Sequence, residues 1–78
     1  MLISQLPQEI KEKALSLQKQ IKSPYKKDTD DLGWAFDWEY KKQSNENIYL
    51  LRERWKFWKQ CHDAKSPNDL PSHIPDYI

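Results

Sequence analysis

Apolar residues recur every three or four positions near the start of the chain, at Leu6, Ile10, Ala14, Leu17 and Ile21. This spacing lines one face of an α-helix. Pro7 suits the opening position, because the N–H that proline lacks would have no partner there. The pattern predicts a helix over residues 7–22, stopped by Ser23-Pro24, and then a loop over residues 23–33.

A different pattern follows the loop. Aromatic residues occupy every second position, at Trp34, Phe36, Trp38 and Tyr40, and the residues between them are small or acidic. A period of two is typical of an extended segment with one aromatic face. An isolated strand leaves its backbone donors and acceptors without partners, so this segment needs a second strand, a helix to lie on, or another protein.

Strong helix formers resume at about residue 46 and predict a second helix to about residue 64, with Asn45 or Asn47 as its cap. Its apolar residues form two adjacent stripes, which are Ile48, Leu51, Trp55, Trp58 and His62, and Leu50, Phe57, Cys61 and Ala64. Arg54 interrupts the apolar arc. Because the two stripes cover more than half of the circumference, we expect two neighbours. One is the helix over residues 7–22, and the other is the segment over residues 34–40 folded back or a different chain.

An alternative interpretation pairs residues 34–41 with residues 49–57 as a β-hairpin, although the connection lacks the Asn-Gly or Asp-Gly of a tight turn. Beyond Lys65, three prolines exclude a regular helix. Leu70, Ile74 and Ile78 recur there at every fourth position. Such a tail either wraps an apolar groove in extended form or is loose.

Composition supports a mostly α protein. The 78 residues include no valine, which disfavours a β-sheet. Ten residues are aromatic, four of them tryptophan, and these must supply the core. The predicted architecture is two amphipathic helices with an aromatic extended segment between them and a Pro-rich C-terminal tail. We expect a single small helical domain over residues 1–65 and an extended tail over residues 66–78.

Charge alternates in blocks along the chain. Residues 1–27 carry six lysines and two glutamates, whereas residues 28–46 carry six acidic residues and two lysines. The net charge of +1 gives no general attraction to nucleic acid. Neither a signal peptide nor a membrane span is expected. Cys61 is the only cysteine and cannot form an internal disulfide, which favours a reducing, cytoplasmic location.

Two groups of residues partly resemble metal sites. Asp28, Asp30, Gly33 and Glu39 match positions one, three, six and twelve of a calcium loop, but Leu32 at position five offers no side-chain oxygen. The second group is Cys61, His62, Asp63 and His73, which has too few ligands at the spacing of a zinc site. The sequence therefore predicts an acidic surface loop, no metal and no cofactor.

No catalytic arrangement is evident either. Cys61 and His62 are adjacent, so on a helix they point about 100° apart and cannot act as a nucleophile and its base. The chain also has no glycine-rich phosphate loop. We therefore expect a protein that is not an enzyme.

Nucleic-acid binding is the alternative function. Arg52, Lys56 and Lys59 line one face of the second predicted helix. Trp55 and Trp58 lie on the opposite, apolar side, and the Asp-rich block would repel phosphates.

Protein binding is the preferred interpretation, because large aromatic residues and arginine anchor protein interfaces. Four tryptophans exceed what two short helices can enclose, although a purely structural role for all four remains open. The predicted contacts, with a foreign protein or a second copy, are Trp34, Phe36, Trp38, Tyr40 and Phe57, with Arg54 and Lys56 supplying polar edges.

Several short motifs add a resemblance. They are Leu6-Pro7-Gln8-Glu9-Ile10 with Ala14 and Gln18, then Phe36-Asp37-Trp38, then Phe57-Trp58. In these, residues 5–60 resemble small uncharacterised proteins encoded by phages and prophages. The resemblance implies a mobile-element accessory protein that binds a host or defence complex stoichiometrically and inhibits it. It implies no catalytic residues.

Overall fold

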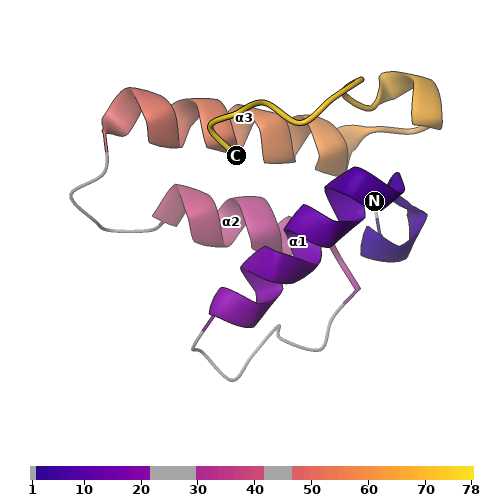
Figure 1. Cartoon of the computed structure of the whole chain (residues 1–78), viewed down its shortest axis with the longest axis horizontal. Helices are drawn as coiled ribbons and strands as arrows, with labels where there is room; N and C mark the ends of the chain where they lie inside the picture. Colours follow the sequence, from indigo (N-terminus) through magenta and orange to yellow (C-terminus); the bar gives the residue numbers. More distant parts are fainter. Residues whose placement is uncertain (1, 22–29, 42–46) are drawn as a thin grey trace.

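The computed structural model describes residues 2–21, 30–41 and 47–78 (Figure 1). The elements follow one another as the 3₁₀ turn η1 (Ile3–Gln5), helix α1 (Gln8–Gln20), helix α2 (Gly33–Lys41), helix α3 (Ile48–Asp63) and the 3₁₀ turn η2 (Pro67–Asp69). α2 and α3 lie side by side and antiparallel, α1 crosses them at an angle, and the C-terminal segment runs back along α3 (Figure 1). The described part of the chain is mostly helical, as its composition predicts.

The first predicted helix is confirmed. α1 starts directly after Pro7, whose carbonyl accepts a hydrogen bond from the N–H of Lys11 at 2.8 Å. The predicted face is the buried one: Ile10 and Ala14 are enclosed, Leu17 packs against the core, and Ile21 is buried just beyond the last turn. One narrow apolar stripe thus holds α1 against the rest of the domain.

The predicted extended segment is wrong, because residues 33–41 form helix α2. The buried positions are Trp34, Ala35 and Glu39, with Trp38 half-buried, a helical and not an alternating set. A helix pairs its backbone groups internally, which a lone strand on this small domain could not do. The hairpin alternative fails for the same reason, since residues 48–63 are also helical.

Two ring contacts fix α2 against α3. The ring of Phe36 meets the edge of His62 with centroids 4.9 Å apart, and Tyr40 meets Trp55 at the same centroid distance. These pairs lie near opposite ends of α2 and set the antiparallel register. At the start of α2, a Cβ on Gly33 would stand 3.3 Å from Nε2 of His62, so glycine permits this close approach.

The second predicted helix is confirmed as α3. Of the two proposed caps, Asn47 serves: its Oδ1 accepts a hydrogen bond from the N–H of Tyr49 at 2.8 Å. Asn45 lies outside the described residues. Of the expected neighbours, the segment that contains Trp34 and Tyr40 does fold back on α3, as helix α2. The helix over residues 7–22 is not a main neighbour, because α1 packs on η1 and α2, and the C-terminal segment lies beside α3 instead.

The C-terminal segment is not detached from the domain. Leu70, Ile74 and Ile78, the residues at every fourth position, pack against the core. The carbonyl of Tyr77 accepts a hydrogen bond of 2.6 Å from Nε of Arg54 on α3. The segment is therefore tied to α3 by both apolar and polar contacts.

The N-terminal segment is tied to the residues that precede α2. Leu2 and Asp31 form an antiparallel bridge, and the N–H of Ile3 donates to the carbonyl of Asp30 at 2.7 Å. The carboxylate of Asp30 accepts two more hydrogen bonds from Ser4, at 2.9 Å from its N–H and 2.6 Å from its hydroxyl. These contacts hold η1 against the entry to α2.

Cys61 lies in the core on α3 and is fully buried. Burial raises the pKa of its thiol from 9.0 to about 12. The unfolded chain therefore loses the proton of Cys61 above about pH 9, whereas the folded chain keeps it, so alkaline pH favours unfolding.

We compare the free energy of unfolding of the wild type with that of Cys61→Ala. Above pH 9, we expect the wild-type value to fall relative to the variant's by up to about 1.4 kcal/mol per pH unit. Urea unfolding at several pH values from about 8 to 10.5 measures this difference. Subtracting the variant removes the contribution of tyrosines and lysines, which titrate in both proteins. A difference that does not change with pH would show that the thiol is not held neutral by the fold.

Candidate protein-binding surface

The structure distributes the predicted aromatic contacts between core and surface. Trp34 and Phe57 are buried, with 2% and 5% of their surface exposed. Phe36 and Trp38 are half-buried and pack against the core. Only Tyr40 is well exposed, at 56%. Of the five predicted aromatic contacts, Tyr40 alone leaves more than half of its surface in solvent.

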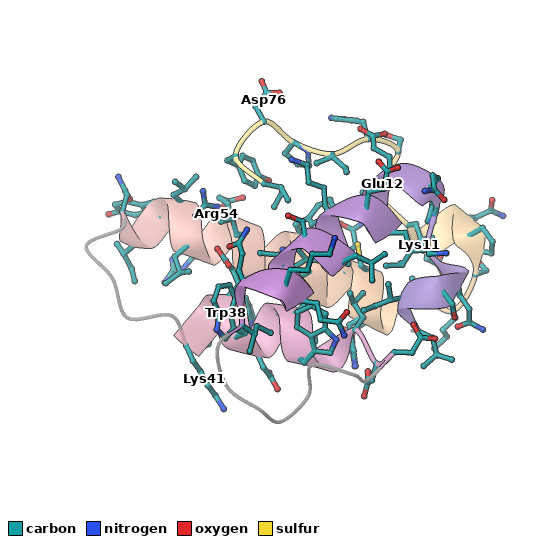
Figure 2. All side chains as sticks on the ribbon, turned by 60° about the horizontal axis from the view of Figure 1, so that its bottom comes forward. Lys11, Glu12, Trp38, Lys41, Arg54 and Asp76 are labelled. Carbon is teal, nitrogen blue, oxygen red and sulfur yellow. The ribbon has the colours of Figure 1, made fainter. Side chains whose placement is uncertain are left out.

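The two predicted polar edges also differ in their surroundings. Arg54 has α2 on one side and the C-terminal segment on the other (Figure 2). Its Nη1 lies 3.4 Å from Oε1 of Glu39, a carboxylate whose side chain is only 4% exposed. Together with its bond to Tyr77, this makes Arg54 part of the interior, where it explains the interruption of the apolar arc. Lys56 is exposed and pairs with Glu53 at 3.3 Å.

The tryptophans are covered more completely than the composition suggested. Trp34 and Trp58 are 2% and 1% exposed, and Trp38 and Trp55 are half-buried. Surplus apolar surface instead comes from smaller or more polar residues. The described ranges contain five exposed large hydrophobic residues, and three of them belong to the end of α2 or the first turn of α3: Tyr40, Ile48 and Tyr49.

The antiparallel helices α2 and α3 form a helical hairpin. We call the surface formed at the end of α2 and the start of α3 by Tyr40, Ile48, Tyr49, Leu51 and Arg52 the hairpin-end surface. Ile48 and Tyr49 are 65% and 73% exposed, the largest exposed fractions of any large hydrophobic residue in the described ranges. A hollow of about 280 Å³ lies between Tyr40, Ile48, Leu51 and Arg52. The surface exists because α3, with 16 residues, runs past the end of the nine-residue α2.

Charge on this surface is unbalanced. Four basic side chains of α3 have a carboxylate within 4 Å: Arg54, Lys56, Lys59 and His62. Among the described residues, no hydrogen bond or ion pair engages Arg52. Lys41, at the end of α2, points away from the helices (Figure 2). Arg52 is therefore the basic side chain that lines the hollow.

The face proposed for nucleic acid is partly neutralised. Lys56 pairs with Glu53, and Nζ of Lys59 lies 2.5 Å from Oδ2 of Asp63. The hydrogen bond from Lys59, followed by that from His62, lowers the pKa of Asp63. Of the three cations predicted to contact phosphates, only Arg52 lacks a carboxylate partner among the described residues.

The candidate metal ligands are not brought together. Glu39 pairs with Arg54 inside the domain, whereas Asp30 binds Ser4 on the surface, and Asp28 lies outside the described residues. In residues 2–21, 30–41 and 47–78, no three His, Cys, Asp or Glu side chains are placed to hold a metal ion. Cys61 is enclosed and protonated, while His62 contacts the ring of Phe36.

A second depression of about 480 Å³ lies between α3 and the C-terminal segment. Its lining mixes charged, polar and apolar residues, namely Glu53, Lys56, Phe57, Gln60, Leu70, Pro71, Ser72, His73, Pro75 and Tyr77. No exposed large hydrophobic residue belongs to it. It is thus a weaker candidate than the hairpin-end surface.

Sequence reasoning missed most of the hairpin-end surface. The helical pattern predicts Ile48 on the stripe that faces the neighbours of α3 and Tyr49 on the polar face. The relative lengths of the helices carry the missing signal, because a helix rises about 1.5 Å per residue and a short one cannot cover a long one. These lengths cannot be compared if residues 34–40 are predicted to be a strand.

The chain matches no protein-family model, no curated protein and no solved structure. None of the helices in the described ranges combines the length and apolar character that crossing a bilayer requires.

Proposed function

We propose that the protein acts without catalysis, by binding another protein through the hairpin-end surface. The observation that carries this proposal is that Tyr40 and Ile48, both more than half exposed, line one hollow, while the exposed Tyr49 follows Ile48 in the first turn of α3. Burying a side chain of the size of isoleucine gains about 1.5–3 kcal/mol of free energy. Side chains left in water do not make this contribution. A partner that covers them recovers that free energy.

The residue types on this surface suit an interface. Tyrosine and arginine are enriched where proteins bind one another, because they bury much area and combine an apolar body with polar ends. The ring pair of Tyr40 and Trp55 gives the surface a rigid edge. Tyr40, Tyr49 and Arg52 are thus of the residue types that contribute most to binding energy at protein interfaces.

The class of partner follows from the resemblance to phage-encoded proteins. A small chain of this kind would bind a host or defence complex stoichiometrically and inhibit it. Such a role needs only an exposed anchor on a stable framework. The core around Trp34 and Trp58 provides that framework.

Ile48→Glu tests this proposal. We expect the variant to lose at least tenfold in affinity for the partner, because a carboxylate placed in an apolar contact must be desolvated without a partner. Immobilised wild-type chain would first capture binding proteins from cells that carry the gene, and purified captured protein would then be titrated against each variant. The fold of each variant is checked by circular dichroism.

Leu15→Glu is the matched control. Leu15 is also an exposed large hydrophobic residue, at 37%, but lies on α1 outside the hairpin-end surface. We expect its affinity to equal that of the wild type. Equal affinity of a folded Ile48→Glu variant would contradict the proposal, and a loss in Leu15→Glu alone would move the binding surface to α1.

A further inference from the structure

We infer that the hairpin-end surface binds a segment of a foreign protein in which an apolar side chain lies within one helical turn of a carboxylate. This inference rests on the proposed function and adds the chemistry of the partner. Two observations carry it: the hollow with its apolar walls, and the side chain of Arg52, which lines the hollow and has no carboxylate partner among the described residues.

The hollow suits a side chain of a protein more than a small molecule. At about 280 Å³, it falls just below the range of roughly 300–1,000 Å³ that small-molecule sites occupy. Tyr40, Ile48 and Leu51 give it apolar walls. One large apolar side chain entering it would bury area on both partners, in the manner of an interface anchor.

Arg52 sets the polar requirement. The guanidinium has five N–H donors in a planar fork that matches a carboxylate, and it stays charged at any physiological pH. Lys56, Lys59 and Arg54 on the same helix each have a carboxylate partner within the protein. Arg52 has none among the described residues and lines the hollow itself, so an incoming carboxylate would find its donors unoccupied.

The positions of these residues fix the spacing in the partner. Ile48 and Arg52 are four residues apart on α3 and are therefore about one helical turn apart. A partner that fills the hollow and meets the guanidinium must place its apolar and acidic groups at a similar separation. Residues three or four apart on a partner helix satisfy this.

The test uses a set of soluble helical peptides that differ at one position. Each carries a leucine and, four residues later, glutamate, glutamine or lysine, on an otherwise identical Ala-rich background. The full chain, labelled with ¹⁵N and ¹³C, is titrated with each peptide. Chemical shifts are followed for the methyl groups of Ile48 and Leu51 and for Nε–Hε of Arg52.

We expect the Leu/Glu peptide to shift these three signals and to bind about three- to tenfold more tightly than the Leu/Gln peptide, with the Leu/Lys peptide weakest. Arg52→Gln should abolish the preference for glutamate and keep the methyl shifts. Lys59→Gln, which removes an exposed cation of the same helix away from the hollow, should preserve the preference.

The outcomes separate the inference from the function on which it rests. Equal binding of the glutamate and glutamine peptides overturns the acidic requirement, while a loss of captured partner in Ile48→Glu would still support protein binding. No shift at Ile48 and Leu51 with any peptide overturns the inference. The same holds if these signals shift with the concentration of the protein alone, because a second copy would then occupy the surface.

Discussion

Trp58→Ala lowers the free energy of unfolding by about 3–5 kcal/mol, the cost of deleting a large side chain from a closed core. Trp58 is 1% exposed, and its ring meets that of Phe57 edge to face, with centroids 5.1 Å apart. A domain of this size commonly has a total stability near that cost. We therefore expect the variant to be largely unfolded at 25 °C, as measured by far-UV circular dichroism and urea titration.

Trp55→Ala is the control for this result, because it removes a tryptophan from the same helix at a half-buried position. Trp55 belongs to the same helix but is half-buried, with its ring against Tyr40. We expect it to lose about 1–2 kcal/mol and to remain folded, because part of its surface already lies in water. If the two variants lost equal stability, the division of the tryptophans between core and surface described above would be incorrect.

Arg54→Met lowers the free energy of unfolding by about 2–3 kcal/mol. Removing one partner of a buried ion pair costs about 3–5 kcal/mol, and the smaller figure applies because Arg54 keeps some contact with water. The variant leaves the carboxylate of Glu39 enclosed without its guanidinium and removes the donor to the Tyr77 carbonyl. Methionine retains the apolar stem, so the change isolates the charged head.

Two further variants complete this measurement. Lys56→Met breaks an exposed pair with Glu53 and should change the free energy of unfolding by less than about 0.5 kcal/mol. Adding Glu39→Gln to Arg54→Met should restore part of the loss, because the buried charge is removed. No recovery in the double variant would assign the loss to the Tyr77 contact instead.

The two amphipathic helices could be predicted because each has a pattern that only a helix explains. The stripe from Leu6 to Ile21 repeats over about four turns, and the burial of its residues follows it. Asn47 is a sequence-level cap, and its side chain makes the hydrogen bond expected of one. In both elements the local pattern and the tertiary packing demand the same conformation.

Helix α2 shows why a short element resists this approach. Over seven residues, aromatic side chains at every second position fit an extended segment, and the decisive residues are those between them. Ala35 and Glu39 are buried because α2 faces the other two helices with more than one side. The burial of Glu39 depends on Arg54, fifteen residues away, and no local pattern contains that pairing.

The candidate site was harder to predict for a related reason. The composition predicts more aromatic surface than the core can enclose, yet Trp34 and Phe57 are buried in the core. Which apolar groups remain outside depends on how far one helix extends past another, and this is a property of the assembled fold. Tyr40 is predicted as one member of the alternating aromatic series, and the structure leaves it 56% exposed, whereas finding Ile48 and Tyr49 requires the position of α2.

The bond between Arg54 and the Tyr77 carbonyl has a consequence for proteolysis. One guanidinium holds both the C-terminal segment and the buried acid of α2. Cleavage near Pro71 would release the peptide that steadies this side chain, and the amides of α2 would then exchange with solvent more rapidly. Protease sensitivity at the chain's end and hydrogen exchange at Glu39 are thereby expected to vary together.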